Sequence, residues 1–319
     1  MSAIKHQNVL VLGATGSTGT WVVDGLLESK KYHIIAGVRP SSLSKPAVSK
    51  LRERGVEIRS ADVSMDDITK LQAAFQGVDT VIVTLIFTEI DTQPKLADAA
   101  KLAGVRRFIT DDWGTACVPG VMKLYDKKFQ IREYVKSIGL GYTFIDVGYW
   151  MSLLVPVERR EHSEYPDVDF IPSNSYAIFG SGDVRTAAIA RSDIGKFVAE
   201  IINDERTLNR YVFCWGDEKS QNEIWEIARK VEAELGKEMD IGPKRVVEKA
   251  EIEEKSKSAD PITALGHEYM NSFFIRGDNT VENAKKPEYG SALDARELYP
   301  HLKVLSLEEF TRQLYSNLY

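Results

Sequence analysis

Cysteine is scarce in this sequence, and the two cysteines it has belong to no motif. Only 2 of the 319 residues are cysteines, Cys117 and Cys214, and they form no CxxC pair. The 5 histidines are scattered without the spacing that metal sites use. We therefore expect no metal and no disulfide framework, and a reducing compartment, the cytoplasm.

Long apolar runs and an excess of positive charge are also missing. No apolar stretch reaches the roughly 18 residues that a membrane-spanning helix needs. Lysine and arginine total 41 against 47 aspartates and glutamates, and the formal net charge is -6. The segment from Met1 to Asn8 has no apolar core of the kind found in signal peptides. We expect a small-molecule partner and neither nucleic acid nor membrane, with a homo-oligomer left open.

What the sequence does contain is a glycine-rich turn between a predicted strand and a predicted helix. Residues 9–12 form an unbroken apolar run, typical of a strand buried on both faces of a parallel sheet. Gly13, Gly16 and Gly19 follow, and apolar residues then recur at helical spacing through Ser29. In this order of elements, a pyrophosphate can rest on backbone N–H groups at the helix N-terminus.

Each glycine has an expected role in such a loop. Gly13 would allow the tight turn, Gly16 would leave room for the phosphates, and Gly19 would let helix and strand approach closely. The alternative is a glycine-rich turn without a ligand. The predicted cofactor contacts in this loop are Gly13, Thr15, Gly16, Ser17, Thr18 and Gly19.

The second predicted strand, residues 33–38, indicates which dinucleotide binds. No Asp or Glu lies between Lys30 and Lys50, where folds that prefer NAD place an acidic residue against the ribose. Arg39 ends the strand instead and can stack on the adenine or pair with a 2′-phosphate, helped by Ser41 or Lys45. The sequence thus favours NADPH. The alternative for Arg39 is a solvated strand end.

Strand and helix patterns alternate through the first 150 residues. Further strands are predicted at 56–62, 80–85, 105–110 and 142–148, with helices between them, one of them opened by Ser64. This succession predicts a doubly wound parallel α/β sheet, the Rossmann fold, over residues 1–150. Asp62, Thr84 and Leu85 lie at strand ends and are predicted to contact the cofactor.

Residues 151–319 are expected to form mainly a smaller substrate-binding subdomain, with some elements returning to the first domain. In this part, Ser192 and Asp193 are predicted to cap a helix, and Ser220 with Glu223 to form a capping box. The segment from Met151 to Ser175 is rich in loop signals and is predicted to wall a pocket.

Several stretches together resemble one family. "GATGSTG", "GVR", "AAKLAGVRRFI", "KKFQIREYVKSIGLGYTFI" and "FFIRGDNTVENA" are similar to the isoflavone reductase-like and NmrA-like branch of atypical short-chain dehydrogenases, over nearly the whole chain. The resemblance implies an NADPH-dependent reductase of a polarised double bond, with a helix lysine handling the proton. That lysine corresponds to Lys128, which would also contact the cofactor. Lys127 flanks the same helical stripe at a similar angle, and the alternative for Lys128 is a solvated or structural lysine.

One loop departs from the family pattern. Where many relatives have Pro-Ser-Glu-Phe-Gly after the fifth strand, this chain has "TDDWG" from Thr110 to Gly114. We expect Asp111, Asp112 and Trp113 to adjoin the nicotinamide and the substrate. Asp111 or Asp112 would pair with Lys128 or with a cationic substrate, or would cap a loop turn. Gly148, Tyr149 and Trp150, after the sixth strand, are also predicted to bind substrate, although aromatic residues there are often core.

The leading function is therefore an NADPH-dependent reductase of a small metabolite, of the secondary-metabolism type, with Lys128 as the proton donor or electrophile. A carboxylate near the hydride donor favours one alternative, an imine or iminium reductase of an alkaloid-type pathway. A second alternative is a non-catalytic, NmrA-like regulator that senses the dinucleotide. The resemblance implies that such sensors tend to lack the helix lysine, so Lys128 favours catalysis.

Overall fold

The computed structural model describes residues 6–157, 177–236 and 245–318. The chain divides into two compact units, each built from separated segments. Unit 1 comprises Met1–Trp113, Lys127–Ile145 and Ile194–Val212. Unit 2 comprises Gly114–Asp126, Asp146–Asp193 and Phe213–Tyr319.

Unit 1 is built on a parallel sheet of five strands in the order β3-β2-β1-β4-β5. Val9 of β1 pairs with Ile34 on one side and with Thr80 on the other. The apolar run at residues 9–12 is fully buried, because β1 is covered on both faces. The predicted doubly wound sheet is confirmed. Its strands are β1 (Gln7–Leu12), β2 (Tyr32–Val38), β3 (Glu57–Ser60), β4 (Thr80–Val83) and β5 (Arg107–Ile109).

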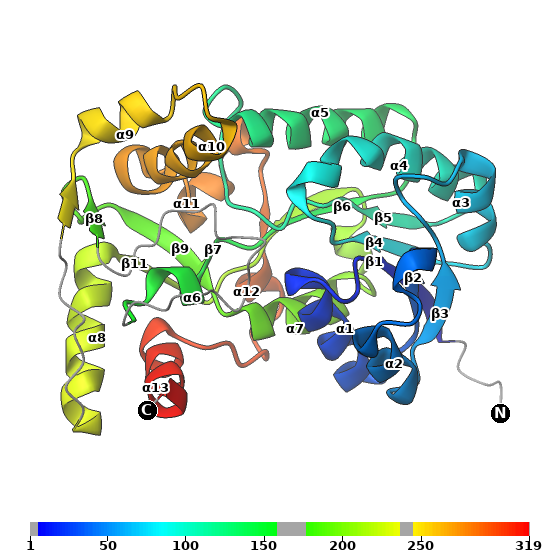
Figure 1. The fold of residues 1–319 in the computed structure, drawn as a ribbon, viewed down its shortest axis with the longest axis horizontal. Helices are drawn as coiled ribbons and strands as arrows, with labels where there is room; N and C mark the ends of the chain where they lie inside the picture. Colours follow the sequence, from blue (N-terminus) through cyan, green and yellow to red (C-terminus); the bar gives the residue numbers. More distant parts are fainter. Residues whose placement is uncertain (1–5, 158–176, 237–244, 319) are drawn as a thin grey trace. The chain divides into compact units, whose positions relative to one another are not determined.

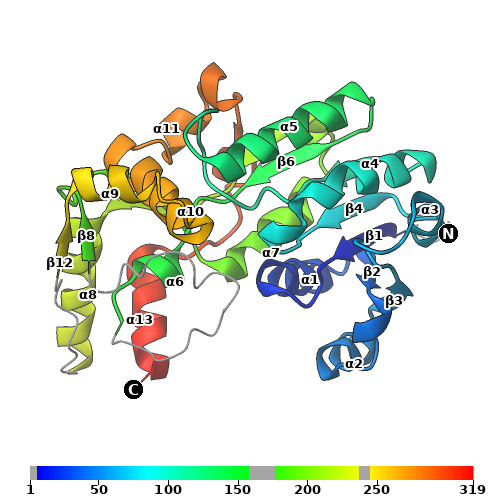
Figure 2. The same ribbon diagram turned by 45° about the horizontal axis from the view of Figure 1, so that its top comes forward.

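Helices cover both faces of this sheet (Figures 1 and 2). The helices α1 (Ser17–Ser29), α2 (Pro46–Glu53) and α7 (Arg191–Ile201) lie on one face, and α3 (Ile68–Ala74), α4 (Gln93–Leu102) and α5 (Lys123–Ser137) lie on the other. A Cβ atom on Gly25 of α1 would lie 2.2 Å from the Gly195 backbone, so the two helices cross in close contact. Three short 3-10 helices complete the unit, η1 (Pro40–Ser42), η2 (Phe87–Thr92) and η5 (Glu205–Thr207).

The sheet changes direction between β1 and β4. From β1 the chain moves outward to β2 and β3, and then returns to the other side of β1 at β4. In such sheets ligands bind outside the carboxyl ends of the strands at this switch point. Beyond β5, an isolated parallel bridge joins Phe108 to Tyr142, just before β6 (Thr143–Asp146), which in turn bonds to β10 (Arg210–Phe213).

Two of the predicted helix starts are wrong, and one is confirmed. α3 begins at Ile68 with Asp67 as its cap, because the chain from Asp62 first makes a separate turn through Ser64. α7 begins at Arg191, so Ser192 and Asp193 lie in its first turn rather than before it. The predicted capping box of Ser220 and Glu223 is present at the start of α8 (Gln221–Leu235).

Unit 2 contains a three-stranded sheet, β11-β9-β7, and a parallel pair, β8 and β12. Its strands are β7 (Tyr149–Trp150), β8 (Ala177–Phe179), β9 (Arg185–Ile189), β11 (Asp217–Ser220), β12 (Arg245–Val247) and β13 (Leu293–Asp294). Its further helices are α6 (Met151–Leu154), α9 (Lys249–Lys255), α10 (Pro261–Met270), η6 (Asn271–Arg276), α11 (Val281–Ala284), η7 (Pro287–Tyr289), α12 (Ala295–Leu298) and α13 (Leu307–Leu318).

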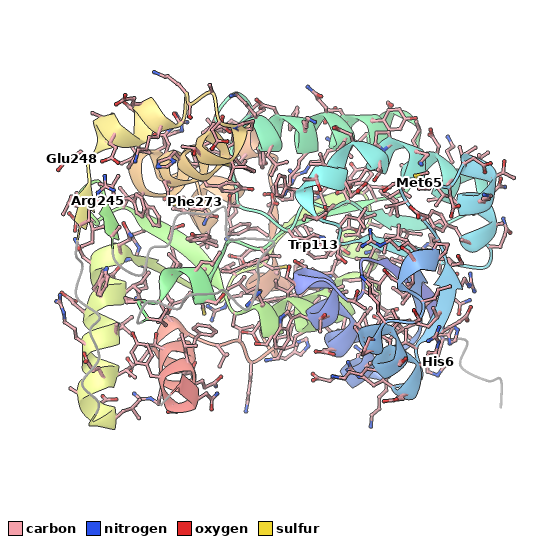
Figure 3. All side chains as sticks on the ribbon, viewed as in Figure 1. His6, Met65, Trp113, Arg245, Glu248 and Phe273 are labelled. Atoms are coloured by element: carbon pink, nitrogen blue, oxygen red, sulfur yellow. The ribbon has the colours of Figure 1, made fainter. Side chains whose placement is uncertain are left out.

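One apolar core joins these elements of unit 2. Phe273 of the π-helix η6, labelled in Figure 3, belongs to this core with residues of β7, α8 and α13. Most of the predicted pocket wall at 151–175 lies outside the described residues. Within the described ranges, every helix is too short or too polar to cross a lipid bilayer.

Candidate dinucleotide site and its neighbouring lysine

The glycine loop packs directly against the end of β4. Gly13 has φ +84°, and a Cβ atom there would lie 2.0 Å from the Thr84 carbonyl oxygen. A Cβ atom on Gly19 would lie 2.1 Å from the Gly13 carbonyl oxygen. No other residue fits at either position without moving backbone, because real Cβ atoms do not approach oxygen so closely. Thr84 secures the contact by donating its hydroxyl to the Leu12 carbonyl at 2.8 Å.

The N-terminus of α1 is left open to an anion. Gly16 is the cap residue of α1, with no side-chain cap bond and no acidic residue in the first turn. The helix dipole and the first N–H groups therefore favour a phosphate at this end.

A cavity of about 280 Å³ adjoins this loop, and all of its wall belongs to unit 1. The wall is formed by the glycine loop and by the carboxyl ends of β2, β3 and β4. Ser17, Thr18, Gly19 and Lys128 do not belong to the wall. Of the predicted cofactor contacts, the wall contains Gly13, Thr15, Gly16, Arg39, Asp62, Thr84 and Leu85.

The β2 side of the cavity is basic. Arg39 and Lys45 both line the wall and are exposed. Arg39 Nε donates to Ser42 Oγ at 3.2 Å, and Ser42 is itself a wall residue. Ser41, expected to help Arg39, is not in the wall; the 3-10 turn that follows Arg39 places Ser42 there instead.

Asp62 shapes the β3 side of the cavity. Its carboxylate accepts the backbone N–H groups of Ser64 and Met65, each at 3.1 Å. It therefore folds the loop after β3 back on itself. Met65, at the tip of this turn, is 82% exposed (Figure 3).

The two neighbouring lysines of α5 point to different partners. Lys127 is exposed and pairs with Asp91, with 2.6 Å between Nζ and Oδ2. Lys128 is half-buried, and its ammonium group donates to the backbone carbonyl of Asp112. Helical periodicity alone did not separate these lysines, whereas the structure places only Lys128 beside the "TDDWG" loop.

The two aspartates of this loop differ in their surroundings. Asp112 is in a buried ion pair with Arg132, whose Nε lies 3.0 Å from Oδ1, and its other oxygen accepts the Thr110 hydroxyl. The Arg132 guanidinium also lies over the Tyr211 ring, 4.7 Å from the centroid. Because both of its oxygens have partners, the Asp112 carboxylate is a structural anion.

Asp111 is the more perturbed of the two aspartates. Burial raises the pKa of Asp111 to about 7, while the positive charge of Lys128 and a hydrogen bond from the Leu85 backbone N–H act in the opposite direction. Its own N–H donates to Gln93 Oε1 at 2.7 Å. Such a carboxyl group changes charge near neutral pH.

Trp113 ends this loop in a conformation that is rare outside glycine. Its φ is +35°, and its indole N–H donates to the Val83 carbonyl at 2.7 Å. Its backbone N–H donates to the Ile145 carbonyl at 3.1 Å. Trp113 (Figure 3) therefore ties the ends of β4 and β6 together, and its ring is buried.

The other predicted substrate residues lie in unit 2. Gly148 has φ +68°, and a Cβ atom there would lie 2.9 Å from the Ala187 carbonyl oxygen. Tyr149 is buried, with its ring centroid 4.7 Å from that of Phe273. Trp150 is half-buried and lies under the Arg191 guanidinium at 5.0 Å. Core packing accounts for Tyr149, whereas Trp150 is only half-buried.

Comparison with known proteins identifies the family. The model of the NmrA-like family matches residues 5–311. The chain belongs to the NmrA-like family. Among curated relatives, asnovolin J 5',6'-dehydrogenase of Aspergillus novofumigatus is 32% identical, covering 98% of this chain and 97% of that protein. An isoflavone reductase-like protein of Olea europaea is 29% identical, and the match covers 96% of this chain and 97% of that protein. The solved structure described as "AtPrR2 with NADP+ and (+)pinoresinol" matches with a TM-score of 0.76 at 22% identity, covering 97% of this chain and 99% of that one. This match confirms the fold.

Three residues that the structure places at or near this site in the NmrA-like protein were not predicted from the sequence. Ser42 reaches the cavity wall, Gln93 holds the Asp111 backbone, and Arg132 neutralises Asp112. Arg132 belongs to the quoted stretch "KKFQIREYVKSIGLGYTFI" and lies four residues after Lys128, on the same side of the helix, so its sequence could have predicted an ion pair with the nearby aspartates. Nothing in the sequence pointed to Gln93, because it meets β5 only through the packing of α4.

Proposed function

We propose that this protein binds NADPH in the glycine-loop cavity and reduces a polarised double bond of a small metabolite, with Lys128 as the proton donor. The protein is an NADPH-dependent oxidoreductase of the NmrA-like family. The pyrophosphate would rest on the N-terminus of α1, and Arg39 with Lys45 would hold the 2′-phosphate.

One chain of contacts supports this proposal most directly. Leu85 lines the cavity, and its N–H bonds to the Asp111 carboxyl. The next residue, Asp112, accepts the Lys128 ammonium group at its carbonyl. The nucleotide cavity and the half-buried lysine are thus linked through adjacent strand ends of the same unit.

The chemistry follows from this arrangement. NADPH, when bound, supplies the hydride. The Lys128 ammonium would donate a proton to the oxygen, carbon or nitrogen atom that gains negative charge as the hydride adds. For the substrate we propose contacts with Asp111, Asp112 or Trp113 of the loop and with Gly148, Tyr149 or Trp150 of unit 2. The two thiols, Cys117 and Cys214, are free and buried, which supports a reducing compartment, the cytoplasm.

The Asp111 carboxyl favours a second candidate, the reduction of a C=N bond. A buried group that becomes an anion near neutral pH would stabilise an iminium ion better than a neutral carbonyl compound. The name of the Aspergillus relative, a dehydrogenase, also supports testing hydride transfer in the opposite direction.

The experiment is a binding and turnover assay with the purified full chain. Calorimetry measures NADPH and NADH binding, and a panel of conjugated ketones, conjugated aldehydes, cyclic imines and pinoresinol is then added while NADPH absorbance is followed. The saturated forms are tested with NADP+. We expect NADPH to bind more tightly than NADH, and we expect one class of the panel compounds to be reduced. If neither coenzyme gives a heat of binding, the proposal is refuted. Binding without any turnover would favour the alternative of a non-catalytic regulator that senses the dinucleotide.

A further inference from the structure

The cavity beside the glycine loop has opposite charges on its two sides. Arg39 and Lys45 line it after β2, whereas Asp62 lines it after β3 and Glu89 lines it from η2. An acidic wall residue repels a dinucleotide, whose phosphates are negative, unless a hydrogen-bond donor offsets its charge. Each of the two carboxylates therefore needs a donor, either from the protein or from the ligand.

The two carboxylates differ in the donors that the protein gives them. Asp62 Oδ1 accepts the backbone N–H groups of Ser64 and Met65, each at 3.1 Å, so Asp62 shapes the turn that follows β3. Glu89 is half-buried, and its Oε2 accepts the Ser64 hydroxyl at 2.8 Å. Among the described residues, no donor lies within hydrogen-bond reach of Glu89 Oε1. The Glu89 carboxylate therefore keeps one oxygen for a ligand.

Glu89 is also held in place before any ligand binds. Its N–H donates to the Ile86 carbonyl at 2.8 Å, which fixes its backbone in η2. The turn that contains Ser64 is fixed as well, because Lys95 of α4 donates to the Asp66 carbonyl at 2.9 Å. A side chain held in this way loses little conformational entropy when it accepts a hydrogen bond from a ligand.

The proposed placement of NADPH decides which part of the ligand lies at this wall. With the pyrophosphate on the N-terminus of α1 and the 2′-phosphate at Arg39 and Lys45, the ribose would lie between these two groups. The base would then face the remaining wall, where Val63 and Ile86 offer apolar contact and Glu89 offers its carboxylate. The amino group is the N–H donor of adenine, so it is the group that a carboxylate can recognise.

We infer that Glu89 determines the base specificity of the cavity: its carboxylate, oriented by Ser64, accepts a hydrogen bond from the amino group of a 6-aminopurine. This inference rests on the proposed function, and it concerns the binding of the nucleotide rather than hydride transfer. A base with a carbonyl oxygen at that position would place one acceptor against another. A hydrogen bond to a charged acceptor changes affinity by roughly tenfold or more.

The test compares the binding of two coenzymes to the purified full chain by calorimetry. One is NADPH, and the other is reduced nicotinamide hypoxanthine dinucleotide phosphate, which has an oxygen in place of the adenine amino group. We expect the wild type to bind NADPH at least about tenfold more tightly than this analogue. In Glu89→Gln we expect the ratio of the two dissociation constants to fall below about threefold, because an amide can turn either its oxygen or its NH2 group toward the base.

Two further variants separate the hydrogen bond from the net charge. Ser64→Ala keeps the charge of Glu89 and removes the donor that orients it, so the ratio should fall, although less than in Glu89→Gln. Glu53→Gln is the matched control, because Glu53 is exposed on α2 and does not belong to the cavity wall. Its ratio should equal that of the wild type.

The possible results distinguish this inference from the proposed function. If the wild type binds the two coenzymes equally well, or if the ratio in Glu89→Gln equals that of the wild type, the inference is overturned and the NADPH site stands. If neither coenzyme binds, the proposed function fails, and the inference fails with it.

Discussion

The buried ion pair between Arg132 and Asp112 allows a quantitative test of how the loop beside β5 is held. Only 6% of the Arg132 side chain and 1% of the Asp112 side chain are exposed. Arg132→Met keeps the length of the side chain and removes its charge, so the Asp112 carboxylate stays buried without its cation. Breaking one partner of such a pair costs about 3 to 5 kcal/mol, and loss of the guanidinium over Tyr211 adds roughly 1 kcal/mol.

The assay is urea denaturation of the wild type, Arg132→Met and the double variant Arg132→Met with Asp112→Asn. We expect the double variant to be more stable than Arg132→Met, because it has no uncompensated carboxylate. Lys127→Met is the matched control on the same helix: its ion pair is exposed, and its loss should change the unfolding free energy by no more than about 1 kcal/mol. If Arg132→Met costs no more than Lys127→Met, or if the double variant is no better than the single one, the reasoning is refuted.

Four further predictions concern the cavity and its neighbourhood. Arg39→Ala should weaken NADPH binding roughly tenfold to hundredfold and leave NADH binding nearly unchanged in fluorescence titrations; equal losses would argue against the phosphate role. Gly13→Ala should abolish NADPH binding and lower the melting temperature, because its Cβ atom would lie 2.0 Å from a backbone oxygen, whereas Gly77→Ala, with φ +72° but nothing within 4 Å, should bind normally. Lys128→Met should lose turnover and keep its NADPH affinity; surviving turnover would place the proton donor elsewhere. The pKa of Asp111 is about 7 in the folded state, above its ordinary value of 3.8, so between these pH values the folded state binds one more proton than the unfolded state. The unfolding free energy of the wild type, measured by denaturation at a series of pH values, should therefore fall relative to that of Asp111→Asn as the pH rises from about 4 to 7.

Most of the fold could be predicted from local sequence because its signals are local. The apolar run at residues 9–12, the glycines that follow and the helical spacing to Ser29 each reflect backbone preferences within a few residues, and β1, the loop and α1 lie where they were expected. The errors fall at helix starts. Ser64 has the right chemistry for a cap, but Asp62 bends the chain first, and only then does Asp67 begin α3.

The sequence by itself determined the parallel sheet, the glycine loop and the basic residue after β2, since a strand, a turn and a helix are specified by neighbours along the chain. Tertiary structure decided the roles of the charged groups. Lys127 and Lys128 lie at similar angles on a helical wheel, and Asp111 and Asp112 are neighbours in one loop. The members of each pair differ in their partners, which come from other helices and from the strand ends. Whether a side chain is charged, and with which group it pairs, depends on its burial and on residues distant in sequence. Both the burial and these contacts arise only when the sheet has folded.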